Sequence, residues 1–223
     1  KNTDGNEKVV EEWVSAEDKE ETADVNEGIH IVEGLKTGVE YTLRETVAPD
    51  GYTVTADTTF TIDETGKVTS TSTTIKEGVL LVEDAKTKVS VSKTDIASGE
   101  ELEGAHIQIL DSKGNVVEEW DSTKKAHVVE GLKTGEEYTL KETVAPDGYT
   151  VTTETTFTID ETGKVTSKGS QAEDGTLLVN DAKTRISVSK VDIADGKELA
   201  GAKIQIIEKD ADGKENVVEE WES

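Results

Sequence analysis

The sequence predicts an all-β protein made of tandem β-sandwich domains, and three observations lead to this fold class. The 223-residue chain repeats itself at a fixed interval, and segments of alternating apolar and polar residues fill each repeat. Turn signals such as Glu-Thr-Gly and Pro-Asp-Gly separate these segments. No segment shows the apolar period of an amphipathic helix. Short strands at this spacing indicate sandwiches of about 95 residues, of the immunoglobulin-like or prealbumin-like kind.

The repeat interval is a whole domain. The motif Glu-Thr-Val-Ala-Pro-Asp-Gly-Tyr occurs at 45–52 and again at 142–149, so the offset is 142 − 45 = 97 residues. The motif Val-Glu-Gly-Leu-Lys-Thr-Gly, at 32–38 and 129–135, has the same offset. A repeat this long is a domain rather than the short unit of a solenoid.

The repeat predicts one complete domain between two partial ones. Residues 1–86 form a first repeat without its opening strands, 87–183 a complete second repeat, and 184–223 the opening strands of a third. We expect the chain, which starts at Lys1, to be an internal fragment of a longer protein. An acidic insertion at 16–26 distinguishes the first repeat, as is typical of a loop at a strand end.

Composition excludes several function classes. The net charge of −25 repels phosphate backbones and anionic lipid, so we expect neither nucleic-acid nor membrane partners. With no cysteine and three histidines, the chain predicts no metal site and no cofactor. The segment Asp210–Glu215 hints at a calcium loop, but its glycine is misplaced for one and the segment suits a hairpin turn. The tryptophans at 13, 120 and 221 are expected to pack in the core or between sheets.

Strand alternation directs three charged side chains toward the core of the second repeat. Lys93 continues the apolar face of its strand, Glu142 follows Tyr138 and Leu140 at the same period, and Asp181 follows Leu177 and Val179. Three interpretations stay open. The residues lie at strand ends in water, or they form a buried ionic network, or they react to form a neutral amide.

The amide interpretation assigns each residue a role. A lysine amine that loses its proton in an apolar setting is a nucleophile, and a buried aspartic acid is its electrophile. The glutamate then moves protons between them as general acid and base. The product is neutral, so it avoids the cost of several kcal/mol for each buried charge.

The chain resembles the Cna B-type or SpaA-like domain of Gram-positive adhesins and pilins. The resemblance rests on Ser-Lys-Thr-Asp-Ile at 92–96, Glu-Leu-Glu-Gly-Ala at 101–105, the motif at 142–149 and Leu-Leu-Val-Asn-Asp-Ala-Lys at 177–183. It implies a prealbumin-like sandwich with a spontaneous isopeptide bond from a first-strand lysine to a last-strand Asn or Asp.

Carried over to the second repeat, the resemblance implies a bond from Lys93 to Asp181, assisted by Glu142. Asn180 is the alternative partner, but it lies on the opposite strand face, and a one-residue slip would reverse this choice. The partial repeats carry unpaired equivalents, which are Glu45, Asp84 and Lys190.

We therefore predict structural stalk repeats of a cell-surface adhesin or pilus-like fibre, whose partners are neighbouring repeats of the same polypeptide. The resemblance implies an extracellular, cell-wall-anchored location. A second hypothesis is a module that binds a host matrix protein or glycan, for which the acidic insertion is the best candidate. The chain is not expected to be an enzyme, because Glu142 would act once, on its own polypeptide.

Overall fold

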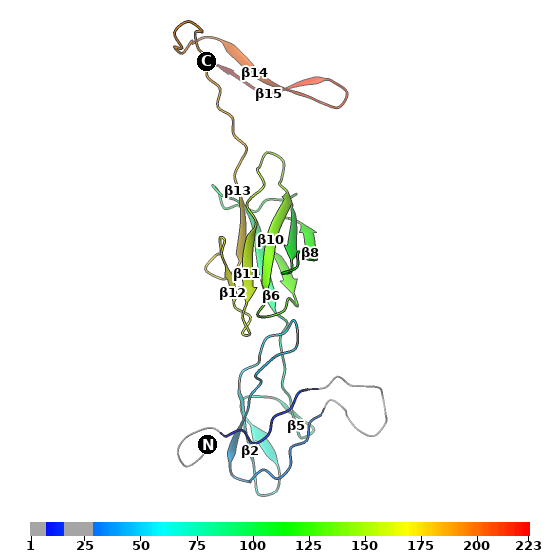
Figure 1. Ribbon diagram of the computed structural model, residues 1–223. Helices are drawn as coiled ribbons and strands as arrows, with labels where there is room; N and C mark the ends of the chain where they lie inside the picture. The colour runs from blue at the N-terminus through cyan, green and yellow to red at the C-terminus, as the bar shows by residue number, and fades with distance from the viewer. Residues whose placement is uncertain (1–7, 16–28) are drawn as a thin grey trace.

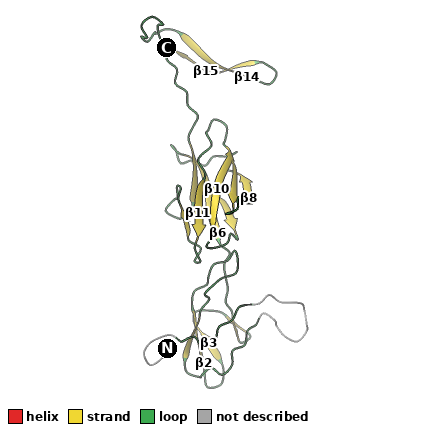
Figure 2. Ribbon diagram, in the orientation of Figure 1, coloured by secondary structure: helices red, strands yellow, loops and turns green. Residues whose placement is uncertain are grey.

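The computed structural model describes residues 8–15 and 29–223. The first repeat, the complete second repeat and a C-terminal hairpin follow one another along the molecule (Figure 1). All regular structure in these described ranges is β-strand, which confirms the predicted all-β class (Figure 2). No helix in the described residues could cross a membrane. The acidic insertion predicted at 16–26 lies outside the described residues.

The second repeat is a sandwich of two sheets. The smaller sheet has β6 (Lys88–Asp95) between β13 (Leu177–Asp181) and β9 (His127–Glu130). The larger sheet has the order β12–β11–β10–β7–β8. Its strands span, in that order, Val165–Ser167, Thr155–Ile159, Glu137–Val144, His106–Leu110 and Val116–Asp121.

Alternate residues of these strands fill the space between the sheets, as the predicted period requires. Within the core, Tyr138 and Phe157 lie opposite each other on β10 and β11, and their rings stack at 5.5 Å. Trp120 is partly buried against this core and stacks on His127 at 4.3 Å, which agrees with the packing role expected for it. The core residues are Val89, Val91, Ala105, Ile107, Ile109, Val129, Leu132, Tyr138, Leu140, Phe157, Ile159, Leu177 and Val179.

The opening and closing strands of the second repeat lie side by side. β6 pairs with β13 in parallel, with Lys93 opposite Val179 and Thr94 opposite Asn180. The other strand ladders in the described residues are antiparallel. Lys93, the sixth of the eight residues of β6, therefore lies opposite the middle residue of β13, two positions before Asp181 at the end of that strand.

The first repeat keeps part of the same architecture. β1 (Glu40–Leu43), β2 (Thr58–Ile62) and β3 (Val68–Ser70) form a sheet in the order of their counterparts β10, β11 and β12. Beside it lies a short hairpin, β4 (Ile75–Lys76) and β5 (Val79–Leu80).

The C-terminal segment forms one hairpin, β14 (Lys203–Lys209) and β15 (Glu215–Glu222). Its turn is closed by Asp210, whose Oδ1 accepts the N–H groups of Asp212 and Lys214 at 3.1 and 2.9 Å. The suggested calcium segment is therefore a hairpin turn. The segment 185–190 lies in no strand, because no described strand pairs with its backbone as β9 and β13 do with β6.

Candidate functional site

The core of the second repeat contains a lysine. Lys93 lies on β6 between the two sheets, and it is the largest of the fully buried side chains. The strand puts it there because Val89, Val91 and Lys93 share one face at a period of two. A buried ammonium requires a compensating group, so its neighbours decide what it can do.

Two carboxylates meet Lys93 from two different strands. Glu142, on β10 in the opposite sheet, has its Oε1 3.0 Å from Lys93 Nζ. Asp181, the last residue of β13, has its Oδ1 in close contact with the same Nζ. These three side chains are at most 1% exposed, so water does not separate them. The structure thus brings together the three residues singled out by strand alternation, and none of them lies in water.

Glu142 is held in place, and its carboxyl binds a proton more tightly than an ordinary glutamic acid does. Its Oε2 accepts the backbone N–H of Thr152 at 2.8 Å. Burial raises the pKa of the Glu142 carboxyl, and the Thr152 N–H and Lys93 offset only part of that effect. A carboxyl with a raised pKa, fixed beside an amine, can both accept and return a proton.

Asp181 is the poorly satisfied member of the site. It is 0% exposed, and its Oδ2 has no hydrogen-bond partner within the described residues. A buried carboxylate oxygen without a donor is costly. Conversion of this carboxyl into an amide would remove one oxygen as water and leave a neutral carbonyl.

Asn180, the alternative partner, is engaged elsewhere. Its Oδ1 accepts a hydrogen bond from the Thr94 hydroxyl at 2.6 Å, between adjacent residues of β13 and β6. Among the described residues, the polar partners of Lys93 Nζ are Glu142, Asp181 and the Val179 carbonyl, and the Asn180 side chain is not one of them. The structure therefore brings the Asp181 carboxyl to Lys93 Nζ, while the Asn180 amide binds Thr94.

In the described part of the first repeat, the equivalent carboxylates Glu45 and Asp84 lie together and form no ion pair with a lysine. Glu45 Oε2 accepts the Thr55 N–H at 2.8 Å, which repeats the Glu142–Thr152 contact. Burial, and next the neighbouring Glu45, raise the pKa of Asp84, whose Oδ1 lacks a hydrogen-bond partner in the described part of the chain. Lys190, the counterpart of Lys93 in the third repeat, is exposed, and the structure brings it to neither carboxylate.

Sequence reasoning missed the backbone groups that position the glutamates. Thr152 follows Glu142 by ten residues, and Thr55 follows Glu45 by the same interval. The only sequence feature that pointed to these donors was the equal loop length after the glutamate in both repeats. A backbone N–H cannot be recognised from the type of the residue that carries it.

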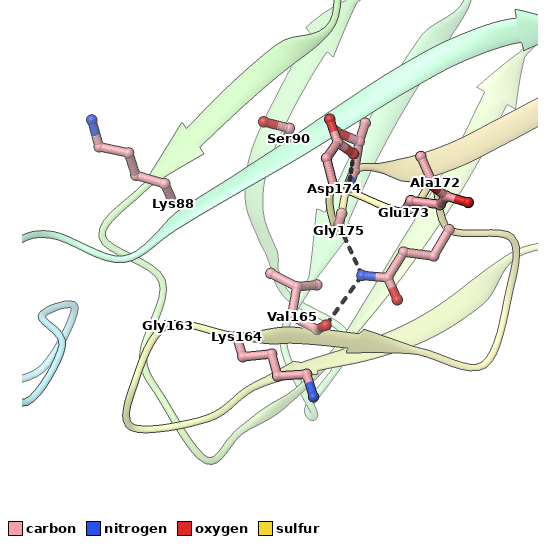
Figure 3. Close-up of a pocket in the computed structure, with 11 residues that line it drawn as sticks. Lys88, Ser90, Gly163, Lys164, Val165, Ala172, Glu173, Asp174 and Gly175 are labelled. Carbon is pink, nitrogen blue, oxygen red and sulfur yellow. Dashed lines mark hydrogen bonds between the residues drawn. The ribbon is translucent and has the colours of Figure 1, made fainter.

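A depression on the second repeat is lined by lysines and carboxylates that include Lys88, Lys164, Glu173 and Asp174 (Figure 3). At its base the Gln171 amide donates to the carbonyls of Val165 and Gly175 at 3.1 and 2.8 Å. The cross-linking candidates do not line it. No group of three or more metal-ligating side chains occurs in the described ranges.

A family comparison identifies the domain. The family model for the SpaA prealbumin-like fold domain matches residues 1–77 and 87–172. The chain belongs to this SpaA family. The predicted resemblance is thereby confirmed, and so is the prealbumin-like fold. No curated protein matches the chain.

Solved structures similar to this SpaA-family chain include pilins and adhesins. The shaft pilin SpaA from Lactobacillus rhamnosus GG is 18% identical with a TM-score of 0.37, over 67% of this chain and 66% of that one. The pilus adhesin SpaC from the same organism, in its open conformation, is 20% identical with a TM-score of 0.38, over 67% of this chain. The Bacillus anthracis TIE protein is 26% identical with a TM-score of 0.41, over 82% of this chain. This chain spans 25% of the SpaC structure and 32% of the TIE structure.

Proposed function

We propose that this chain is a series of stalk repeats of a surface adhesin or pilus-like fibre, in which the second repeat is locked by an amide between Lys93 and Asp181. The observation that carries the proposal is the buried contact of Lys93 Nζ with both Asp181 and Glu142. Two observations support the structural role and an extracellular, cell-wall-anchored location. The chain belongs to the SpaA family, and the solved structures similar to it include a shaft pilin and a pilus adhesin.

The reaction needs only the three side chains. A proton passes from the Lys93 ammonium to the Asp181 carboxylate, which leaves a neutral amine beside a neutral acid. Lys93 Nζ attacks Asp181 Cγ, and Glu142 accepts a proton from the nitrogen and donates one to the departing hydroxyl. The C–O bond breaks, the N–C bond forms, one water leaves, and Glu142 ends in its starting state. The residues act once, so the chain is not a turnover enzyme.

The buried ion pair alone is a weak source of stability. The cost of removing two charges from water largely cancels their attraction, whereas an amide carries no charge. An amide between the first and last strands also restricts the unfolded chain, as a disulfide does. The chain contains no cysteine, so this restriction would come from lysine chemistry instead.

Intact-mass measurement tests the proposal. We expect the chain to be about 18 Da lighter than its sequence requires, because amide formation expels one water. Lys93→Ala and Glu142→Ala should restore the full sequence mass. The matched variants Lys190→Ala and Glu45→Ala change the equivalent residues of the partial repeats, and both should keep the deficit. A full sequence mass in the unmodified chain would disprove the amide.

A further inference from the structure

The first and second repeats are joined by contacts that do not involve the cross-linking residues. Thr87 lies just before β6 and is 1% exposed. Its N–H donates to the Gly51 carbonyl at 2.9 Å, and its carbonyl accepts the Gly131 N–H at 3.0 Å. Its hydroxyl donates to the Leu132 carbonyl at 2.6 Å. One residue of the connecting segment therefore binds a turn of the first repeat and a loop of the second.

Two more contacts join the repeats directly. Asp50 Oδ2 lies 2.6 Å from Lys133 Nζ, and this carboxylate raises the pKa of the Lys133 ammonium. The Val54 N–H donates to the Glu161 carbonyl at 2.9 Å. Lys133 precedes β10, while Glu161 belongs to the loop between β11 and β12. The first repeat is thus held at two separate loops, which opposes rotation about the connecting segment.

Gly51 allows the two backbones to touch. Its φ of +84° belongs to the left-handed region, and a Cβ at this position would lie 2.7 Å from the Gly131 carbonyl oxygen. The contacted atom is backbone, so it cannot move aside as a flexible side chain would. A side chain at position 51 would therefore push the second repeat away.

The end of the second repeat has the same surface. The Thr184 N–H donates to the Gly148 carbonyl at 2.8 Å, as the Thr87 N–H does to Gly51. The hydroxyls of Thr87 and Thr184 approach these carbonyls at 3.3 and 3.2 Å. Asp147 corresponds to Asp50, since 147 − 50 equals the repeat length of 97 residues. The turn of the second repeat therefore has the same conformation as the turn of the first, although no Gly-Leu-Lys loop is docked on it in the described structure.

We propose that the Pro-Asp-Gly turn of each repeat is a docking surface for the Gly-Leu-Lys loop of the following repeat, and that it aligns successive repeats as a stiff column. The occupant is another copy of this repeat, which the observed Asp50–Lys133 and Thr87 contacts identify. The exposed Lys36 of the first repeat is the matching cation for a preceding turn. This docking goes beyond the proposed amide and does not depend on it.

A pair of spin labels across the junction tests the docking. The chain has no cysteine, so Lys76→Cys and Lys113→Cys, both at exposed positions, place one label in each repeat. We expect a narrow distance distribution in the full chain. Gly51→Ala should broaden or shift it. Gly148→Ala is the matched control, because Gly148 has the same turn at φ +82° but nothing within 4 Å of its Cβ position.

A charge reversal gives a second test that leaves the turn backbone unchanged. Asp50→Lys should broaden the distribution, the added Lys133→Asp should narrow it again, and Asp147→Lys should have no effect. A broad distribution in the parent chain, or equal broadening by Gly51→Ala and Gly148→Ala, would overturn the docking. The intact mass of the same samples reports the amide separately, so failure of one proposal is distinguishable from failure of the other.

Discussion

At the scale of single residues, Asp181 and Asn180 can be distinguished by the group that leaves. In the proposed reaction with Lys93, Asp181 would expel water, whereas an asparagine at the same position would expel ammonia and give the identical amide. We expect Asp181→Asn to react with a deficit of about 17 Da, and to reach the same final mass as the parent chain. Intact-mass spectrometry measures both values.

Asn180→Ala is the control for this substitution. It removes only the hydrogen bond from Thr94, so the deficit of about 18 Da should persist. Loss of the deficit in Asn180→Ala, with retention in Asp181→Ala, would show that the neighbouring residue is the acyl partner.

Because the pKa of Asp84 is raised, we expect the stability of the first repeat to depend on pH. Its raised pKa means that the folded repeat binds this proton more tightly than the unfolded chain does. The resulting stabilisation is complete below the unfolded pKa of about 4 and is lost as the pH rises through the folded pKa. We expect hydrogen exchange of the β2 amides to show weaker protection at pH 7 than at pH 4, once intrinsic rates are corrected.

Asp84→Asn should remove most of this dependence. Asp63 provides a control of opposite sign, because the Thr65 hydroxyl and then the Lys67 N–H lower its pKa. The stabilisation of the folded state by ionised Asp63 is present above the pKa of the unfolded chain, and it is lost as the pH falls through the lower pKa of the folded state. If the protection of the β2 amides changes with pH equally in Asp84→Asn and in the parent chain, the Asp84 carboxyl is not the cause of that change.

Alternation predicted which charged residues point inward, because a strand leaves only two faces. This reasoning singled out Lys93, Glu142 and Asp181. In the structure, Lys93 Nζ contacts the carboxylates of both Glu142 and Asp181. The Thr152 N–H that fixes Glu142 was not predictable, since a backbone donor is set by loop conformation. The stack of Trp120 on His127 was missed for a related reason, because it depends on the pairing of distant strands.

At the scale of elements, the parallel pairing of β6 with β13 makes a cross-link possible. It puts Lys93 opposite Val179, and Asp181 two residues further along the same strand, on the same face. Sequence patterns predicted the strands but not this pairing, because the alternation of residues within one strand does not show which other strand pairs with it. The segment 185–190 shows the same limit, since it has the pattern of β6 yet is not a strand without flanking strands.

Loss of Lys93 should destabilise the second repeat. Lys93→Ala leaves Glu142 and Asp181 buried without their cation, a change that costs about 3–5 kcal/mol in other buried pairs. It also removes the restriction that a covalent tie imposes on the unfolded chain. Hydrogen exchange of the β6 and β13 amides measures the loss. Lys190→Ala, at an exposed position, should leave these amides unchanged, and equal protection in both variants would contradict a role for the site.

At the scale of the whole molecule, the contacts between the first and second repeats lie around the connecting segment. The offset of 97 residues predicted a division between residues 86 and 87, and Thr87 is the residue whose backbone and hydroxyl bind both repeats. The length of a domain can be read from a repeat, but the contacts between domains cannot. Asp50 and Lys133 lie in repeated motifs whose role as partners became visible only in the structure.

The proposed cross-link and the proposed docking together predict how the molecule responds to force. Tension enters the second repeat through β6 and leaves through β13, so an amide between Lys93 and Asp181 carries the load past all the chain between them. Lys93 and Asp181 are 181 − 93 = 88 positions apart in the sequence, and the chain between them would extend by about 300 Å if released. In single-molecule pulling we expect this increment to be absent from the parent chain and present in Glu142→Ala. Glu45→Ala should resemble the parent chain, because no lysine in the described residues pairs with Glu45 or Asp84. Should the parent chain release the same length as Glu142→Ala, the load would be carried by strand pairing alone, and the stalk would owe its strength to the fold rather than to a covalent bond.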